Sequence, residues 1–508
     1  MRNLIVCADG TWNTPDQEDN GILAPTNVYK FYNCLAAEDA DGNPQLKYYH
    51  PGVGTDGGLF EKALGGGAGK GLSRNIMSGY QWLAREYQEG DRIFLFGFSR
   101  GAYTVRSLGG FIARCGLLDL GGQTSAEGWQ RVETAYEKGY RNRKNRSSWS
   151  AGWSFHKGKA ADSHVDIHFI GVWDTVGALG IPDNMALLNF LDDRDDHVFH
   201  DVKLSAKTRH ARHAVAIDEI RASFQPTLWD EKNTKTDVKQ VWFTGVHADV
   251  GGGYAADGLA DITLAWMTDE AASKGLAFYP QTLAQIQPDT WGIIHNSCQG
   301  LFGLLPSTPR NIPKLIKSNS SVHASVSERK SMPSIRQGTY RQHVSLRKNE
   351  SRTLSIYADQ PWNTTNLYLE QGETYLFEAS GEWLDASISC GPGGTNDGQF
   401  KVGELVHIAG TVLGKFEKLL KKLGNNADAN VNGTRRYEDF PWFSLLGTIS
   451  DGGSVTKDKT FTAHTTFLIG EQATLKVKRA GYLYCFANDA WNFYGNNKGS
   501  MTLTVTRQ

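Results

Sequence analysis

The chain has 508 residues, of which 40% are hydrophobic and 21% are charged, and its formal net charge at pH 7 is −1. These values are typical of a globular protein of roughly two to four domains, and the near-zero charge argues against a nucleic-acid partner. The first residues lack an apolar stretch long enough for a signal peptide, and no run approaches the length of a membrane span. We therefore expect synthesis in the cytoplasm without a signal peptide.

The cysteines are scattered along the chain, at Cys7, Cys34, Cys115, Cys298, Cys390 and Cys485, with no C-x-x-C pair. This spacing fits neither a zinc site nor a disulfide framework and favours a reducing compartment. Cys390 and Cys485 share one region and could pair, but we expect free buried thiols.

Up to about residue 345, apolar runs that predict strands alternate with helical patterns. The runs are Leu4–Ala8, Arg92–Phe96, Asp166–Val172 and Val241–Val246. A helix is predicted over Ser73–Tyr87, where Ile76, Tyr80, Leu83 and Tyr87 share one face. Strands separated by helices indicate an α/β fold, with a mostly parallel sheet covered on both faces.

A glycine-rich run, Gly65–Gly71, is superficially similar to a phosphate-binding loop. In a Walker A motif the first glycine would stand where this chain has Leu64, and Ser or Thr would follow Lys70, where Gly71 stands instead. No strand precedes the run. We expect a flexible loop at the mouth of the site.

The most informative motif is Gly97-Phe98-Ser99-Arg100-Gly101, which directly follows an apolar run and precedes a helical pattern. A G-x-S-x-G elbow lifts its serine clear of the sheet, and both glycines are needed because any Cβ there would meet neighbouring backbone. The pattern predicts Ser99 as a nucleophile and the backbone N–H of Arg100 as an oxyanion donor. A purely structural turn is the alternative.

A nucleophilic serine needs a histidine base and a carboxylate that orients it, and both are expected where parallel strands end. Asp174 follows the run that ends at Trp173, and His247 follows the run that ends at Val246. The order Ser99, Asp174, His247 is that of α/β-hydrolases. Asp174 could instead be a helix N-cap, and His247 could be a turn histidine. Asp249 is a rival acid, while His295 and His323 are rival bases.

The pattern of apolar residues changes near residue 345, within a segment of roughly residues 307–349 that is rich in Ser, Lys, Arg and Pro. Short alternating runs such as Thr353–Tyr357 and Met501–Val505 then predict an antiparallel β-sandwich. We expect a catalytic domain over residues 1–345 and a sandwich domain over residues 346–508. An apparent insertion at about residues 402–436 has an apolar helical stripe over Val412–Leu423, with lysines interleaved. It suits either an interfacial helix on anionic lipid or a helix packed on the neighbouring domain.

Several motifs occur together in one order: Asp9–Asn13, Thr26–Val28, Gly97–Ala102, Val172–Gly177, His213, Ala216–Glu219, Arg221, Pro226–Trp229 and Trp242–Tyr254. Over roughly residues 1–335 this set resembles an α/β-hydrolase-like family of unknown function that includes type VI secretion phospholipase effectors. The resemblance implies Ser99 as nucleophile, Asp174 as acid and His247 as base. It also implies that the loop with Thr11 supplies a second oxyanion donor beside Arg100.

The carboxyl-terminal stretch Ala487–Ser500, together with Ala379–Trp383, resembles the calcium-dependent galactose-binding lectin fold of bacteria. Asp489, Asn496 and Asn497 carry the hard oxygen ligands that suit Ca²⁺. The resemblance adds the carbonyl of Phe493 as a ligand. The polar pair that holds the sugar has no clear counterpart around Gly391–Gly394. A β-turn without metal is the alternative.

These observations predict a serine hydrolase of lipid carboxylic esters, with phospholipids favoured by the family resemblance. Met185–Leu191 and Leu301–Leu305 are apolar runs suited to an acyl groove. The alternatives are a non-lipid serine esterase, a phosphoryl-transfer enzyme built on Asp9, or a carbohydrate- or membrane-binding protein with a weakly active hydrolase domain. The resemblance further implies a bacterial cytoplasmic origin, export without a signal peptide, and partners such as a membrane surface, a secretion apparatus or an immunity protein.

Overall fold

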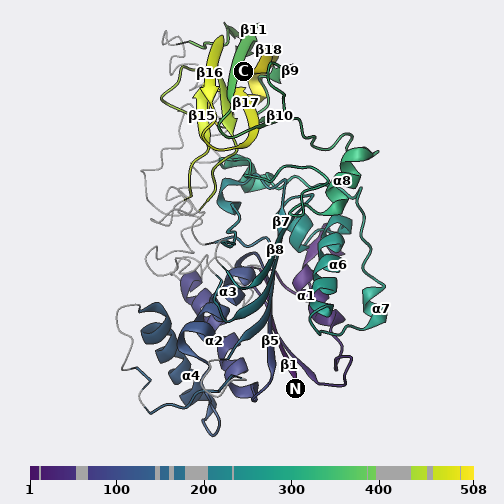
Figure 1. The fold of residues 1–508 in the computed structure, drawn as a ribbon, viewed down its shortest axis with the longest axis vertical. Helices are drawn as coiled ribbons and strands as arrows, with labels where there is room; N and C mark the ends of the chain where they lie inside the picture. The colour runs from purple at the N-terminus through teal and green to yellow at the C-terminus, as the bar shows by residue number, and fades with distance from the viewer. Residues whose placement is uncertain are drawn as a thin grey trace.

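The fold is that of a computed structural model. It describes residues 1–10, 13–52, 67–142, 149–150, 152–158, 165–177, 204–231, 234–385, 387–395, 436–454, 461–491 and 493–508. The chain forms a parallel α/β part followed by an antiparallel β-sandwich (Figure 1). The α/β fold class predicted from the alternating runs is thereby confirmed.

The α/β part is built on a six-stranded sheet in which every strand pair is parallel. Its strands, in spatial order, are β4 (Gln45–His50), β1 (Asn3–Ala8), β5 (Arg92–Phe98), β6 (Ile167–Trp173), β7 (Thr208–Ala216) and β8 (Asp237–Phe243). Since the strands are parallel, all of their carboxyl ends meet at one edge, where functional groups of such folds collect.

Helices cover both faces of this sheet (Figure 1). One face carries α2 (Gly67–Glu86), α3 (Ser99–Cys115) and α4 (Ser125–Thr134), and the other carries α1 (Asn27–Cys34) and α6 (Gly258–Ala272). Alternate residues of one strand serve the two cores: Leu4 packs with the α2 and α3 residues, and Ile5 packs with those of α1 and α6. The strands are therefore buried on both faces, which explains their continuous apolar runs.

The remaining short elements before the sandwich lie in the connections. They are β2 (Glu18–Asp19), β3 (Ile22–Leu23), the π-helical turn Ala135–Arg141, the 3-10 turn Ala222–Phe224, α5 (His247–Gly251), α7 (Pro280–Leu283), the 3-10 turn Gly300–Leu304 and α8 (Ala324–Ser331).

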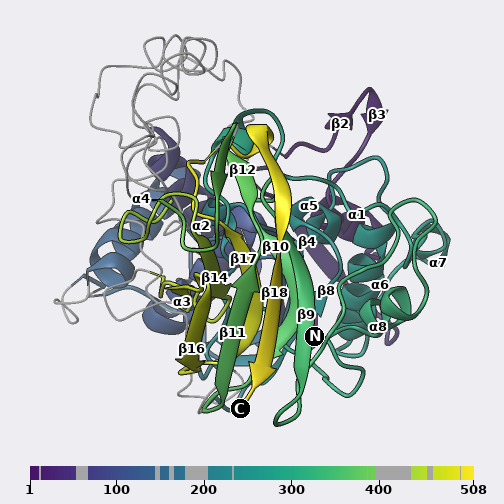
Figure 2. The same ribbon diagram turned by 90° about the horizontal axis from the view of Figure 1, so that it is seen from above.

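The sandwich consists of two antiparallel sheets around a core of its own. One sheet contains β10 (Asn363–Leu369), β17 (Gly481–Ala487), β14 (Leu445–Ile449) and β15 (Thr465–Leu468). The other contains β13 (Ile388–Cys390), β12 (Trp383–Asp385), β18 (Asn497–Arg507), β11 (Thr374–Ser380) and β16 (Gln472–Lys476), with β9 (Ser351–Tyr357) paired to β18. Figure 2 looks onto this sandwich, with the helices of the α/β part beyond it.

One local prediction is wrong. Residues 67–71 of the glycine-rich run are not a loop but the start of α2. The following turns of that helix are anchored by the buried residues Leu72 and Ile76. Extending an existing helix adds a hydrogen bond for each residue fixed, so even glycines join it. Residues 65–66 lie outside the described part of the chain.

All six cysteines are free in the structure, as predicted. Among the described residues, no helix combines the length and the apolar character needed to cross a membrane.

Candidate active site

Ser99 stands at a strained turn between β5 and α3, near the middle of the sheet. Its φ is +56°, in the left-handed region that non-glycine residues seldom adopt. A Cβ on Gly97 would lie 2.4 Å from the carbonyl oxygen of Gly101, and one on Gly101 would lie 2.1 Å from that of Ala8. Both glycines are therefore required by close backbone approach, as expected for an elbow that presents a serine.

The loop after β1 lies beside this serine. A Cβ built on Gly10 would come within 3.2 Å of the Cβ of Ser99. The loop is fixed by the buried Asp9, whose carboxylate accepts hydrogen bonds from the hydroxyls of Thr26 (2.6 Å) and Tyr49 (2.8 Å) and from the Gly10 N–H (2.7 Å). Thr11, the predicted second oxyanion donor, lies outside the described residues.

Asp174 and His247 form a buried pair at the ends of β6 and β8. His247 Nδ1 lies 2.6 Å from Asp174 Oδ2, and both side chains are almost completely buried. Nδ1 must carry the hydrogen of this bond, which leaves Nε2 of a neutral ring as an acceptor. The φ of Asp174 is +36°, so the backbone at this residue is also strained.

Arg310 makes the charge of Asp174 tolerable in the interior. Its Nη1 and Nη2 donate to Asp174 Oδ1 (2.7 Å) and Oδ2 (2.9 Å), and the Ala216 N–H donates to Oδ1 at 3.0 Å. Burial works to raise the pKa of Asp174, but Arg310 and then His247 outweigh it and hold this pKa well below its usual range. Asp174 is therefore ionised at every physiological pH.

The ring of His247 lies between two aromatic side chains, at centroid distances of 4.5 Å from Phe98 and 5.0 Å from Phe224. Burial lowers the pKa of His247, against the pull of Asp174. The imidazole is thus neutral near pH 7, which is the state that a general base needs.

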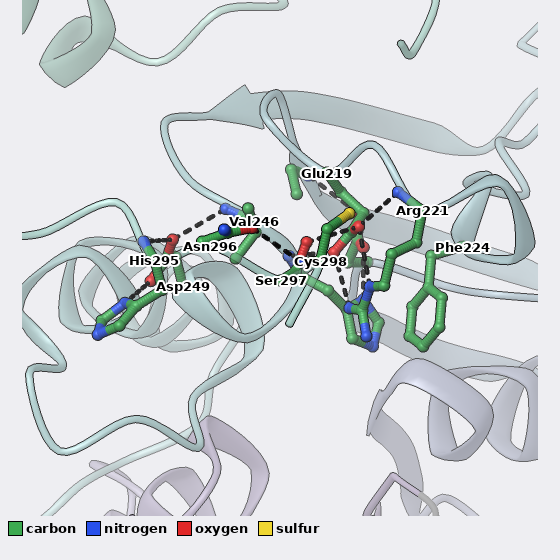
Figure 3. A network of polar contacts seen from close by, with 12 residues as sticks. Glu219, Arg221, Phe224, Val246, Asp249, His295, Asn296, Ser297 and Cys298 are labelled. Atoms are coloured by element: carbon green, nitrogen blue, oxygen red, sulfur yellow. Dashed lines mark hydrogen bonds and ion pairs between the residues drawn. The ribbon is translucent and has the colours of Figure 1, made fainter. Parts of the chain in front are cut away.

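A second polar network, which includes Glu219 and Arg221 (Figure 3), contacts the backbone of His247. The buried Glu219 accepts from the His247 N–H at 3.2 Å and from the Ser297 hydroxyl at 2.9 Å. Arg221 pairs with the same carboxylate through Nε (2.9 Å) and Nη2 (2.7 Å), and its guanidinium lies 3.4 Å from the centroid of the Phe224 ring. Glu219 therefore links the backbone of His247 to Arg221 and, through it, to Phe224.

The rival residues have other partners in the structure. Asp249 pairs with His295, with 2.5 Å between Oδ1 and Nδ1, and its other oxygen accepts from the Val246 N–H at 2.9 Å (Figure 3). His323 is the N-cap of α8, since its Nδ1 accepts from the Ser325 N–H, and its ring stacks on Phe243. The geometry thus pairs Asp174 with His247 and gives His323 a structural task.

Sequence reasoning missed Arg310 as a site residue. It lies in the polar segment of residues 307–349, whose composition predicts a boundary between domains. No local pattern distinguishes it from the other arginines there. Only the structure identifies Arg310, because it shows that the carboxylate of Asp174 is buried and therefore needs a cationic partner. Glu219 and Arg221 stood in the recognised motif but without an assigned role.

Of the two apolar runs expected near the site, one is described. Phe302, in the 3-10 turn Gly300–Leu304, packs on Phe224 with ring centroids 5.7 Å apart. Met185–Leu191 lies outside the described residues, as do residues 402–435, for which the sequence predicts a lysine-flanked helix.

The predicted calcium ligands gather at one end of the sandwich. Asp489 Oδ2 accepts from Asn497 Nδ2 at 2.9 Å, and Asn496 Nδ2 donates to Asp385 at 2.8 Å. The Oδ1 atoms of Asn496 and Asn497 are both buried without a hydrogen-bond partner. Burial, together with Asp385, raises the pKa of Asp489 to about 7. In the described part of the chain, no group of three or more His, Cys, Asp or Glu residues could hold a metal ion.

A parallel sheet with a serine on a strained strand-to-helix turn, and an aspartate–histidine pair at the carboxyl ends of two further strands, defines an α/β-hydrolase-like protein. Residues 2–270 match the family described as the type VI secretion phospholipase effector Tle1-like catalytic domain. The chain belongs to this family.

Individual proteins match only part of this chain. An uncharacterized protein of Saccharomyces cerevisiae is 34% identical over 241 residues, which are 44% of this chain and 32% of the yeast protein. The chain thus spans about a third of that relative. Among solved structures, an uncharacterized protein from Pseudomonas aeruginosa matches at 16% identity and TM-score 0.35, covering 57% of this chain and 49% of that one.

Two further solved structures match weakly. The Tle1 effector bound to the VgrG spike from the type 6 secretion system matches at 16% identity and TM-score 0.26, covering 50% of this chain and 51% of that chain. The N-terminal domain of EclA, titled a PllA-like lectin, matches at 15% identity and TM-score 0.18, covering 31% of this chain and 95% of that chain.

Proposed function

We propose that the chain is a serine hydrolase of lipid carboxylic esters, with phospholipids as its substrates and Ser99, His247 and Asp174 as its triad. The observation that carries this proposal is the buried contact of 2.6 Å between Asp174 and His247 at the sheet edge that also carries the strained turn of Ser99; the ring of His247 lies 4.5 Å from that of Phe98, the residue before Ser99. The family membership supports the lipid substrate class.

In the proposed reaction, Ser99 Oγ attacks the ester carbonyl while its proton passes to Nε2 of His247. The imidazolium that forms is stabilised by Asp174, whose orientation Arg310 fixes. His247 then gives the proton to the leaving alcohol, which leaves an acyl group on Ser99. A water molecule, deprotonated by His247, releases the fatty acid and restores the serine.

The developing oxyanion needs donors that are already in place. The backbone N–H of Arg100 directly follows Ser99 in the first turn of α3, which is the position of an oxyanion donor in a nucleophile elbow. The loop of Asp9 and Gly10 adjoins Ser99, so the next residue, Thr11, is our proposed second donor. Oxyanion donors of this kind typically contribute about 3–4 kcal/mol each to catalysis.

A phosphoryl-transfer reaction on Asp9 is less well supported. The carboxylate of Asp9 is buried and already accepts three hydrogen bonds, and burial raises its pKa. These contacts suit a residue that fixes a loop better than a nucleophile. A serine esterase of non-lipid substrates is the second candidate function. The two candidates differ in the substrate that they hydrolyse faster.

The test compares a short soluble ester with phospholipid vesicles of varied anionic content, and labels the protein with a fluorophosphonate. We expect the label on Ser99 and faster hydrolysis of vesicles. Ser99→Ala and His247→Ala should each lose most activity, while His323→Asn should keep it. Labelling elsewhere would refute the nucleophile, and a preference for the short ester without gain on vesicles would leave an esterase.

We further propose a Ca²⁺ site in the sandwich, formed by Asp489, Asn496, Asn497 and the carbonyl of Phe493. The two buried Oδ1 atoms without partners fit a hard cation, as does the carboxylate of Asp489, which is costly to ionise without one. The ion would hold the loop before β18. Asp385 contacts Asn496 and adds negative charge nearby.

Calorimetric titration of chelator-treated protein with Ca²⁺ tests this site. We expect saturable heat and a rise in melting temperature, both lost in Asp489→Asn. Asp359→Asn, which changes an exposed acid of the same sandwich, is the matched control. Absence of heat and of a thermal shift in the unchanged protein would refute the site.

A secretion apparatus or immunity protein as partner, a membrane surface, and export without a signal peptide stay predictions. They rest on the family, whose description names type VI secretion effectors.

A further inference from the structure

The sandwich contacts the α/β part close to both Asp174 and His247. The first link begins at Gly245, two residues before His247, where φ is +113°. Asp218 clamps this glycine: its N–H donates to the Gly245 carbonyl at 3.0 Å, and its Oδ2 accepts from the Gly245 N–H at 2.8 Å. The turn that delivers His247 therefore depends on where Asp218 is held.

Asp218 is held from outside the parallel sheet. Arg341 Nε donates to Asp218 Oδ1 at 2.6 Å, and the Tyr340 hydroxyl donates to Oδ2 at 2.8 Å. Arg341 Nη1 in turn donates to the hydroxyl of Tyr484, at 2.7 Å, in strand β17 of the sandwich. An unbroken chain of charged and polar contacts thus runs from the sandwich to the turn before His247.

The second link concerns the segment that carries Arg310. Trp362 Nε1 donates to the hydroxyl of Ser307 at 3.0 Å, and the Leu315 N–H donates to the hydroxyl of Tyr482 at 2.9 Å. Between them, His464 Nε2 lies 2.8 Å from the carbonyl oxygen of Pro309, next to Arg310. The sandwich therefore holds this segment on both sides of the arginine that pairs with Asp174.

The helix α5, which begins at His247, has only five residues, which is too short to be stable without contacts from elsewhere in the chain. The orientation of the base thus depends on side-chain contacts made to it, of which Asp218 and Glu219 are two.

We propose that the sandwich is a working part of the hydrolase site, with Arg341 and His464 as positioning residues for His247 and for the Arg310–Asp174 pair. The proposal rests on the proposed triad. If the sandwich were only an appended binding module, breaking its contacts with the α/β part would change stability or substrate affinity but not the rate of the chemical step.

The experiment uses the full chain with Arg341→Met, Arg341→Lys, Tyr484→Phe and His464→Gln. The matched control is Tyr375→Phe, which removes a hydroxyl that accepts from the Glu370 N–H within the sandwich. Two quantities are measured: kcat and KM on a short soluble ester, and hydrogen exchange in the peptide around residues 244–251.

We expect Arg341→Met to lower kcat at least about tenfold at unchanged KM, since a displacement of about 1 Å can cost a hundredfold. Arg341→Lys should recover part of the loss, and Tyr484→Phe and His464→Gln should show smaller losses of the same kind. Hydrogen exchange around His247 should accelerate in Arg341→Met and Tyr484→Phe, but not in Tyr375→Phe.

If the unchanged protein hydrolyses the ester, and all variants match Tyr375→Phe in kcat and in exchange, the inference is overturned. If the unchanged protein neither turns over nor labels with a fluorophosphonate, the proposed function fails. Faster exchange in Arg341→Met would then still establish the link from the sandwich to the turn of His247.

Discussion

Replacing Arg310 by Met removes the cation that compensates Asp174 while keeping an unbranched side chain of similar length. Both partners are fully buried, and two hydrogen bonds, of 2.7 and 2.9 Å, join them. Removing one member of such a pair leaves an uncompensated buried charge and destabilises a protein by about 3–5 kcal/mol. At roughly 2 °C per kcal/mol for a domain of this size, the melting temperature should fall by about 6–10 °C.

The same change should alter the titration of His247. The groups around its ring include Asp174, which raises its pKa, Glu219, which also raises it, and Arg221, which lowers it. Without Arg310, the charge of Asp174 is no longer shared, so it stabilises the imidazolium more strongly. A protonated imidazole cannot act as a base, and the acid limb of the kcat/KM profile should move to higher pH by roughly one or two units.

The assay is hydrolysis of a short soluble ester between pH 5 and 9, with melting measured in parallel. Arg212→Met is the matched control, since Arg212 is equally buried and pairs with Glu270 and Asp237, away from the candidate site. It should lose stability but keep the acid limb in place. If the acid limb stays fixed in Arg310→Met, or moves equally in Arg212→Met, the reasoning about Asp174 is wrong.

Two further predictions concern histidines outside the proposed triad. His213 is fully buried, and its Nε2 accepts from the Thr175 N–H at 3.1 Å; burial, and secondarily Arg106, lowers its pKa to about 3. The unfolded chain binds a proton at this histidine below its ordinary pKa of 6.5, whereas the folded chain does not, so the free energy of unfolding should fall by about 2 kcal/mol between pH 7 and pH 5. Urea unfolding at the two pH values should show a smaller fall in His213→Asn. An equal fall in both proteins would contradict this prediction. His323→Asn should keep turnover and the cap of α8, because Asn also caps helices well, and should lose only the stability that the ring gains by stacking on Phe243. A loss of turnover without unfolding would revive His323 as the base.

The sheet could be predicted from the sequence wherever a strand is apolar throughout. Strands β1, β5 and β6 begin and end within a few residues of the runs that predicted them. Strand β7 was missed because its sequence, Thr208–Ala216, contains two arginines and two histidines. Arg212 and His213 are buried there all the same, the first by pairing with Glu270 and the second by accepting from Thr175. Polar residues can therefore be buried in this strand because residues from other segments of the chain pair with them.

The candidate site divides in the same way. Ser99 could be predicted because the constraint on the glycines of its elbow is local, and the carboxyl ends of the strands led to Asp174 and His247. Nothing local marks Arg310 or Arg341, whose partners Asp174 and Asp218 lie more than a hundred residues away. The structure places Gly10 beside Ser99, while Thr11, the predicted second donor, lies outside the described residues.

The family match ends at residue 270, before the arginines and the sandwich residues that make these contacts. Within the matched residues lie the elbow, the proposed acid and base, and the buried Glu219. Beyond them lie Arg310, which pairs with Asp174, and Arg341, which pairs with Asp218 beside the turn before His247. A buried carboxylate costs several kcal/mol without a partner, so a chain cut at the end of the match would leave Asp174 uncompensated. The physical unit that supports the proposed chemistry is therefore larger than the unit that sequence comparison recognises, and it includes the sandwich.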